Sequence, residues 1–182
     1  MTQRPWKALP YRLSSEVKEY LIDMHFFGEI DYEHLIYDGE YEDGLPRRNF
    51  DVGLDIGYFD WREIPNLEKD LEQISKDVKI QRVSVCKMNP NVSVPFHIDT
   101  QKAAAAAPAL RGMNRKCSIL FPIMPEPENY ITTCFEQGPS PYHECMLINT
   151  SVNHGLQNNG YFRINLQLWI GQSFEEVADL LN

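Results

Sequence analysis

Alternation of apolar and polar side chains over residues 162–170 constrains the fold more than any other feature of the sequence. Every second residue of this segment, beginning with Phe162 and ending with Ile170, is apolar. The residues between them are Arg163, Asn165, Gln167 and Trp169. Successive side chains of a strand point to opposite faces, so this strand has one apolar face and one largely polar face. Such a strand is typical of a small β-barrel with an apolar exterior packed on helices and a polar site in its mouth.

Three further strands are predicted from local patterns. Residues 81–86 alternate, with Val83 and Val85 as the apolar positions. Residues 117–123 (CSILFPI) and 146–152 (MLINTSV) are of strand length, and each contains a short apolar run. The second half of the chain is therefore expected to consist almost entirely of strands.

Helices are predicted over residues 14–24, 67–78 and 173–182. In the first, a serine precedes apolar residues at helical spacing, and the second follows a proline. In the third, Ser173 and Glu176 have the spacing of a capping box. Each helix is expected to pack one apolar face on the core.

The chain is expected to form a single domain, because 182 residues are enough to bury a core without disulfides. Helical support and loops are assigned to about residues 1–80, the β core to about 81–170, and the C-terminal helix to 173–182. Residues 31–60 are predicted as loops with one or two short strands. The five alanines at 103–107 are predicted as a further loop.

Charge and hydropathy exclude several classes of function. The formal net charge of −9 argues against a nucleic-acid partner, because affinity for phosphates comes from clustered Lys and Arg. The adjacent basic residues Arg47–Arg48 and Arg115–Lys116 are interpreted as solvated edges. No apolar run is long enough to span a bilayer, and the N-terminus lacks the apolar core of a secretory signal, so a cytosolic location is expected.

The cysteines agree with that location. None of the four forms a C-x-x-C pair, and we interpret them as reduced, mostly buried apolar groups. They are Cys86, Cys117, Cys134 and Cys145.

Candidate metal ligands come first from the segment VPFHIDT. On a strand, His97 and Asp99 point to the same side, so both can reach one ion while Ile98 packs behind them. The remaining histidines are interpreted as ordinary core or surface residues. These are His25, His34 and His143.

A third ligand is predicted from the segment NHGLQNNGYFRINLQLWI. If Asn159 and Gly160 form a two-residue hairpin turn, His154, Arg163 and Asn165 lie on one face of the ribbon. A three-residue turn would change this register. Two imidazoles and a carboxylate form a ligand set that holds Fe(II) and leaves three positions open. An arginine within an apolar strand needs an anion, and a bound carboxylate can supply it through bidentate hydrogen bonds.

The chain thereby resembles the Fe(II)- and 2-oxoglutarate-dependent oxygenases over about residues 92–170. Their pattern of His-x-Asp/Glu, a distal His, and an Arg or Lys one strand later corresponds to His97, Asp99, His154 and Arg163. The resemblance implies an α+β, mainly β fold: a double-stranded β-helix, or jelly-roll, with the N-terminal helices on its outer face. It implies Fe(II) on the two histidines and Asp99, with these three as catalytic residues, and 2-oxoglutarate on Arg163.

Within this superfamily the segments VPFHIDT, GMNRKCSILFPI and NHGLQNNGYFRINLQLWI look most like aspartyl/asparaginyl β-hydroxylase-like members. Many of these lack the carboxylate that Asp99 supplies here. Some carry a basic residue on the strand at 117–123, where this chain has Ser118 at an inward position. Ser118 and Asn165 join Arg163 as candidate contacts of the co-substrate.

The resemblance implies hydroxylation of an amino-acid or peptidyl side chain with O₂, and with succinate and CO₂ as co-products. A prolyl hydroxylase or a small-metabolite hydroxylase is the alternative within the superfamily, although prolyl 4-hydroxylases usually place Lys where Arg163 stands. Two alternatives from other functional classes also remain: a cupin-like metal-binding or sensing protein, and a structural β-domain without metal. The sequence does not determine the substrate or the oligomeric state.

Overall fold

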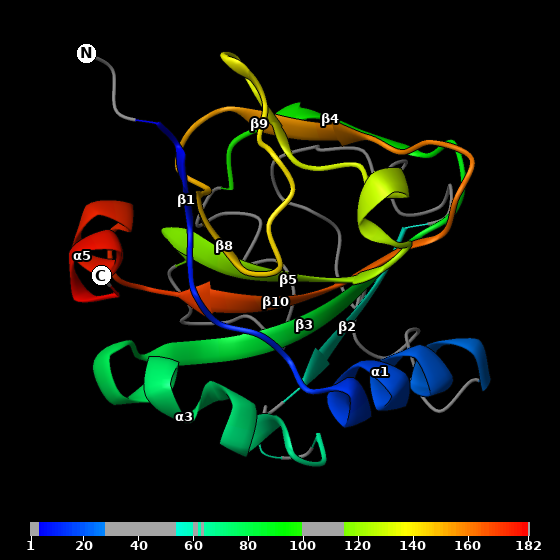
Figure 1. The fold of residues 1–182 in the computed structure, drawn as a ribbon. Coiled ribbons are helices and arrows are strands. Elements are labelled where there is room, and N and C mark those ends of the chain that lie inside the picture. The colour runs from blue at the N-terminus through cyan, green and yellow to red at the C-terminus, as the bar shows by residue number, and fades with distance from the viewer. Residues whose placement is uncertain (1–3, 28–53, 60–61, 63, 100–114, 182) are drawn as a thin grey trace, which may run out of the picture.

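The computed structural model describes residues 4–27, 54–59, 62, 64–99 and 115–181. Within these ranges the strands form two antiparallel sheets, one of six strands and one of four. Figure 1 shows the two sheets as stacked layers, with helices α1 (Ser15–Phe27) and α3 (Leu67–Asp77) below the larger sheet. None of the helices described is long and apolar enough to cross a membrane.

The larger sheet has the strand order β1-β8-β5-β10-β3-β2. Its strands are β1 (Trp6–Ala8), β2 (Leu54–Phe59), β3 (Ile80–Met88), β5 (Cys117–Met124), β8 (Met146–Asn149) and β10 (Arg163–Ile170). The four strands expected from the sequence are all present in this sheet, although β8 ends at Asn149 rather than at residue 152. β2 is a short strand within the segment 31–60, most of which lies outside the described residues, as do alanines 103–107.

β10 confirms the alternation from which its strand was predicted. It lies between β5 and β3 and pairs with both along most of its length. Its apolar side chains, Ile164, Leu166, Leu168 and Ile170, are fully buried in the main core. Arg163, Asn165 and Trp169 alternate with them and are buried at the opposite face. The polar face is thus enclosed within the protein rather than exposed to solvent.

The helices begin where the sequence indicates and contribute to the same core as β10. Ser14 accepts a hydrogen bond from the Val17 N–H, and its own N–H and hydroxyl donate to the Asp70 carboxylate of α3. Both hydrogen bonds of the capping box at Ser173 are present at the start of α5 (Phe174–Leu180). The buried side chains that α1 and α3 contribute to the core are Val17, Leu21, Leu67, Leu71 and Ile74.

Truncating a core residue of α3 is expected to destabilise the protein strongly. Leu71 is fully buried in the main core, so Leu71→Ala should lower the free energy of unfolding by about 2–5 kcal/mol. Leu180→Ala is the matched control, because Leu180 is 47% exposed and its loss should change stability by no more than about 0.5 kcal/mol. Urea denaturation of both variants measures the difference. Equal losses would mean that α3 does not pack on the sheet.

The smaller sheet has the strand order β4-β9-β6-β7. Its strands are β4 (Ser93–His97), β6 (Cys134–Phe135), β7 (Gly138–Pro139) and β9 (His154–Gln157). β4 is an edge strand and pairs with β9, which in turn pairs with β6. A short 3₁₀ helix, η4 (Pro127–Asn129), precedes β6.

The hairpin expected at Asn159–Gly160 is wrong. β9 pairs with β4 and β6 in the smaller sheet, whereas β10 belongs to the larger one, so the chain crosses between the two layers here. Asn158 donates its N–H to Val92 O, and Asn159 O accepts from the Asn91 N–H. The connection therefore bonds to the segment before β4, and its residues do not form a hairpin turn between β9 and β10.

Candidate metal centre

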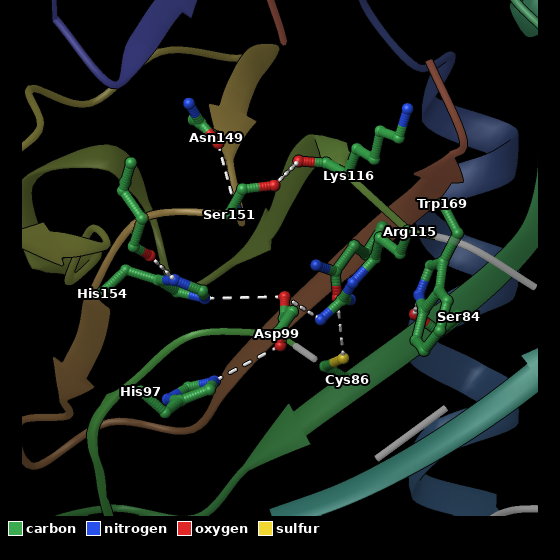
Figure 2. A network of polar contacts seen from close by, with 12 residues as sticks. Ser84, Cys86, His97, Asp99, Arg115, Lys116, Asn149, Ser151, His154 and Trp169 are labelled. Atoms are coloured by element: carbon green, nitrogen blue, oxygen red, sulfur yellow. Dashed lines mark hydrogen bonds and ion pairs between the residues drawn. The ribbon is translucent and has the colours of Figure 1, made fainter. Parts of the chain in front are cut away.

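His97, Asp99 and His154 come together at one end of the smaller sheet. Their candidate ligand atoms all lie within 4.8 Å of one another. His97 Nε2 is 3.5 Å from Asp99 Oδ1, and His154 Nε2 is 3.7 Å from Asp99 Oδ2. Figure 2 shows both imidazoles pointing at the carboxylate between them. This is the only such cluster of three or more metal-ligating side chains in the described part of the chain.

The sheet places the two histidines and a loop contact places the aspartate. His97 is the last residue of β4 and lies directly opposite His154, the first residue of β9. Asp99 was expected on the same strand as His97, but β4 ends before it. The Asp99 N–H instead donates to Thr150 O at 3.1 Å, so the segment after β8 fixes the position of the carboxylate.

A backbone carbonyl fixes the orientation of each imidazole. His97 Nδ1 lies 2.8 Å from Pro95 O, and His154 Nδ1 lies 2.9 Å from Val152 O. A carbonyl only accepts hydrogen bonds, so Nδ1 carries the proton and Nε2 of the neutral ring keeps its lone pair. Histidines that bind metals are commonly held in this way by a partner on the other ring nitrogen.

Close contact between β9 and β4 supports this arrangement. The register of the two strands shifts between Val94 and His97, so the segment Pro95–Phe96 bulges opposite Gly155. A Cβ atom on Gly155 would lie 2.9 Å from Val94 O and 3.1 Å from Phe96 N, both of them backbone atoms. Glycine is therefore required at the position next to His154.

Gly155→Ala is expected to disturb the metal centre as well as the fold. The added methyl group can be accommodated only if β4 moves, and β4 carries His97. We expect the free energy of unfolding to fall by about 1–3 kcal/mol and the affinity for Co(II) to fall with it. Gly160→Ala is the control, because a Cβ there meets no atom within 4 Å. Unchanged Co(II) affinity in Gly155→Ala, measured by titration, would contradict the close packing.

The electrostatics favour the protonation state that a metal ligand needs at His154 and Asp99, but act against it at His97. Burial is the main influence on the His154 imidazole and lowers its pKa, so the ring is neutral at pH 7. Burial also acts to lower the pKa of His97, but hydrogen bonds to Asp99 and to Pro95 O outweigh it and raise that pKa. Burial alone would raise the pKa of Asp99, but the Arg115 guanidinium and His97 together lower it well below its usual range. Asp99 is therefore ionised.

Arg115 is a residue whose place the sequence interpretation missed. Its guanidinium forms an ion pair with Asp99, and its side chain is only 13% exposed, so it is not part of a solvated edge. The other basic pair, Arg47–Arg48, lies outside the described residues. No local signal distinguishes Arg115 from Lys116, because Arg115 and Asp99 do not belong to one strand. Their contact therefore leaves no pattern in the sequence.

Arg163 is the first residue of β10 and contacts the segment between η4 and β6. Its Nε donates to Ile131 O at 3.0 Å, and its guanidinium carbon lies 4.7 Å from the centre of the Tyr130 ring. The residues that line a small cavity here are Leu120, Pro122, Tyr130, Thr132, Thr133, His143, Met146 and Arg163. The Tyr130 hydroxyl and His143 Nε2 are buried and have no hydrogen-bond partner within the described ranges. Burial raises the pKa of Tyr130 to about 12, so its hydroxyl remains a donor.

The structure brings Asn165, but not Ser118, close to Arg163. Asn165 is the next residue on the same face of β10, and its Oδ1 is buried without a partner in the described structure. Ser118 pairs with Trp169, six residues from Arg163, which is about 20 Å along a strand. Leu120, the other inward residue expected on β5, lines the Arg163 cavity instead.

Comparison with known proteins identifies the fold. No family model matches the sequence, and no curated protein is significantly similar to it. Among solved structures, the 2-oxoglutarate complex of a viral collagen prolyl hydroxylase from Paramecium bursaria Chlorella virus 1 is similar, with a TM-score of 0.55 and 14% identity. That match covers 92% of this chain and 95% of the viral one.

Two further structures illustrate the range of proteins with this fold. A prolyl hydroxylase from Trichoplax adhaerens, in complex with a hypoxia-inducible factor peptide, has a TM-score of 0.58 and 14% identity over 96% of this chain and 86% of that one. A non-heme α-ketoglutarate-dependent carbocyclase from nogalamycin biosynthesis has a TM-score of 0.54 and 10% identity over 91% and 78% of the two chains. The chain therefore has the double-stranded β-helix fold of the 2-oxoglutarate/Fe(II) oxygenases, together with a His97-Asp99-His154 triad. The likenesses give no support to the aspartyl/asparaginyl subgroup.

Proposed function

We propose that this protein is an Fe(II)- and 2-oxoglutarate-dependent oxygenase that hydroxylates its substrate. The observation that carries the proposal is the triad: two imidazoles held through Nδ1 by carbonyls, each presenting Nε2 to the ionised Asp99 carboxylate. Paired with the fold, this arrangement is the ligand set of a non-heme iron site with open positions.

The residues present fit a bound divalent metal. The three ligand atoms are slightly farther apart than they would be around an ion, so small side-chain movements suffice to close the set. His97 and His154 supply neutral nitrogen ligands, and Asp99 supplies one negative charge. Fe(II) bound here, together with 2-oxoglutarate and O₂, would supply the oxidising chemistry that hydroxylates a C–H bond and leaves succinate and CO₂.

The polar groups around Arg163 suit one end of a dicarboxylate. Arg163 offers a guanidinium, and the Tyr130 hydroxyl and His143 Nε2 are polar groups that lack a partner in the structure described. A carboxylate accepts hydrogen bonds from such groups, and it would neutralise the buried arginine. The cavity is small, so the carboxylate must displace part of the surrounding side chains. Leu120 and Met146 line the same cavity and limit the access of water.

Among amino-acid and peptidyl substrates, we favour a prolyl residue over an aspartyl or asparaginyl one. Prolyl hydroxylases stand among the structures similar to this chain, and the aspartyl/asparaginyl reading rests on short sequence segments alone. The carbocyclase keeps a small metabolite as the alternative. The cytosolic location remains a prediction from the sequence.

An anaerobic titration tests the proposal. Fe(II) and then 2-oxoglutarate are added to the apoprotein and to His97→Ala, and the visible charge-transfer band of the chelate is recorded. We expect the band in the wild type and its loss in the variant. Metal binding without the band would indicate a cupin-like binding protein, and no metal binding would reject the metal centre. Succinate release with proline-, aspartate- and asparagine-containing peptides then compares the substrate classes.

A further inference from the structure

Arg115 contacts the carboxylate that lies between the two histidines. Its Nη2 forms an ion pair with Asp99 Oδ2, and the two side chains are only 13% and 15% exposed. Figure 2 shows the guanidinium approaching Asp99 from the side opposite His97 and His154. Asp99 is thus enclosed by three partners, of which only Arg115 carries a permanent charge.

The guanidinium is itself held in place. Its central carbon lies 4.1 Å from the centre of the Trp169 ring, a distance at which the cation and the ring face attract each other. The indole N–H of Trp169 donates to the buried Ser84 hydroxyl at 3.0 Å, which fixes the orientation of the ring. The two larger-sheet strands β3 and β10 therefore provide a rigid support for Arg115.

The backbone beside Arg115 is also fixed. The Lys116 N–H donates to Ile170 O at 2.9 Å, and Lys116 O accepts from the Ser151 hydroxyl at 3.0 Å. The first of these contacts joins the start of β5 to the end of β10, and the second joins it to the segment after β8. The same segment holds the Asp99 N–H through Thr150 O. Arg115 and Asp99 are consequently placed by one connected set of backbone contacts.

We propose that Arg115 is the positioning residue of the metal ligand Asp99: it holds Oδ2 and leaves Oδ1 for the ion. This inference rests on the metal centre of the proposed function. A carboxylate that must bind a metal with one oxygen loses affinity if it can rotate, and a hydrogen-bonded partner on the other oxygen prevents this. Arg115 also compensates the buried negative charge before the metal arrives.

Arg115 has a second possible effect, which is to weaken metal binding, and the two effects can be told apart by experiment. A guanidinium close to the metal repels a divalent cation and competes with it for the carboxylate. If that repulsion dominated, removal of Arg115 would tighten metal binding. The sign of the change in affinity therefore decides between a positioning residue and a competitor.

The test is a Co(II) titration of the apoprotein, followed through its visible d–d bands. Arg115→Met should weaken Co(II) binding by about 10- to 100-fold and alter the bands, because Asp99 is no longer held. Arg115→Lys should recover part of the affinity, since an ammonium group retains the charge without the fork of donors. Lys116→Met is the matched control, because it removes the same charge at the adjacent, exposed position. Its affinity and spectrum should equal those of the wild type.

Two substitutions of Trp169 test the support of Arg115 without altering the charge. Trp169→Phe keeps an aromatic face for the guanidinium, and Trp169→Leu removes it, so only the second should reproduce the Arg115→Met effect in part. Circular dichroism and thermal unfolding of each apoprotein establish that it is folded. If Arg115→Met does not fold, Arg115→Lys and the Trp169 pair decide the outcome.

The results separate this inference from the proposed function. If the wild type binds no Co(II), the metal centre itself is rejected. If the wild type binds Co(II) and Arg115→Met binds it as tightly as Lys116→Met, or more tightly, Arg115 is not a positioning residue and the proposed function stands.

Discussion

Alanine in place of His154 is expected to lower the affinity for Fe(II) or Co(II) by more than about 100-fold and to abolish succinate formation. Removing a direct ligand should lower the metal affinity more than changing a residue that only contacts a ligand does. His97→Ala should have an effect of the same size, because both imidazoles present Nε2 to Asp99. Metal titration and a succinate assay measure the two effects. His25→Ala is the matched control, since residue 25 belongs to α1 and not to the smaller sheet that carries the two histidines.

The two histidines should differ in rescue by free imidazole. The His97 side chain is 42% exposed, whereas that of His154 is 9% exposed. Imidazole from solution can therefore enter the space left by His97→Ala and restore metal binding, but it cannot reach the space left by His154→Ala. Wild-type metal affinity in both alanine variants would show that the triad does not bind the metal.

Arg163→Met is expected to weaken 2-oxoglutarate binding by roughly 30-fold to several thousand-fold while leaving metal affinity unchanged. Truncation of a buried, hydrogen-bonded charge pair costs about 2–5 kcal/mol, which gives this range. Arg163 is 5% exposed, so little water is available to replace its contact with a carboxylate. The dissociation constant of 2-oxoglutarate for the metal-loaded protein measures the effect, and Arg163→Lys should recover part of the affinity.

A second co-substrate makes the Arg163 test specific. 2-Oxopentanoate has the same chelating end as 2-oxoglutarate but lacks the distal carboxylate. The wild type should strongly prefer 2-oxoglutarate, and Arg163→Met should bind the two compounds almost equally. If the variant kept the wild-type preference, the distal carboxylate would bind elsewhere. Thermal unfolding of the variant checks that the lost contact with Ile131 O has not disrupted the fold.

The elements of this fold could be predicted from sequence where the signal is local. The alternation of β10, the apolar stripe of α3 and the capping box at Ser173 each depend on residues within one element. The His-x-Asp spacing likewise brought His97 and Asp99 together, although Asp99 lies beyond the strand. The fold class required the resemblance as well, because alternation alone does not determine how strands are ordered in two sheets.

The connection from β9 to β10 could not be predicted from its turn residues. Asn159–Gly160 is a strong hairpin signal in isolation. Here Asn158 donates its side-chain amide to Asn89 O and Tyr161 O, so contacts with a segment about 70 residues earlier determine the path. The local preference of these residues for a turn does not determine which sheet the next strand joins.

Three residues of the proposed sites were not predicted from the sequence, for a shared physical reason. Arg115, Tyr130 and His143 have ordinary sequence surroundings, and their roles arise from contacts between distant segments. Arg115 forms an ion pair with Asp99, and His143 and Tyr130 line one cavity with Arg163. Ser118 is predicted from its inward position on the strand where some of the resembling oxygenases carry a basic residue, and its register places it about 20 Å along the sheet from Arg163.

The crossing of the chain between layers has a mechanical consequence. His97 and His154 belong to the smaller sheet, whereas Arg163 belongs to the larger one. A co-substrate held by the metal at one end and by Arg163 at the other would link the two sheets directly. Without it, side-chain packing and the loops between the sheets set their spacing. With it, ionic and coordinate bonds would also resist movement of one sheet relative to the other. The co-substrate would therefore make both sheets together more rigid, and not only a single loop.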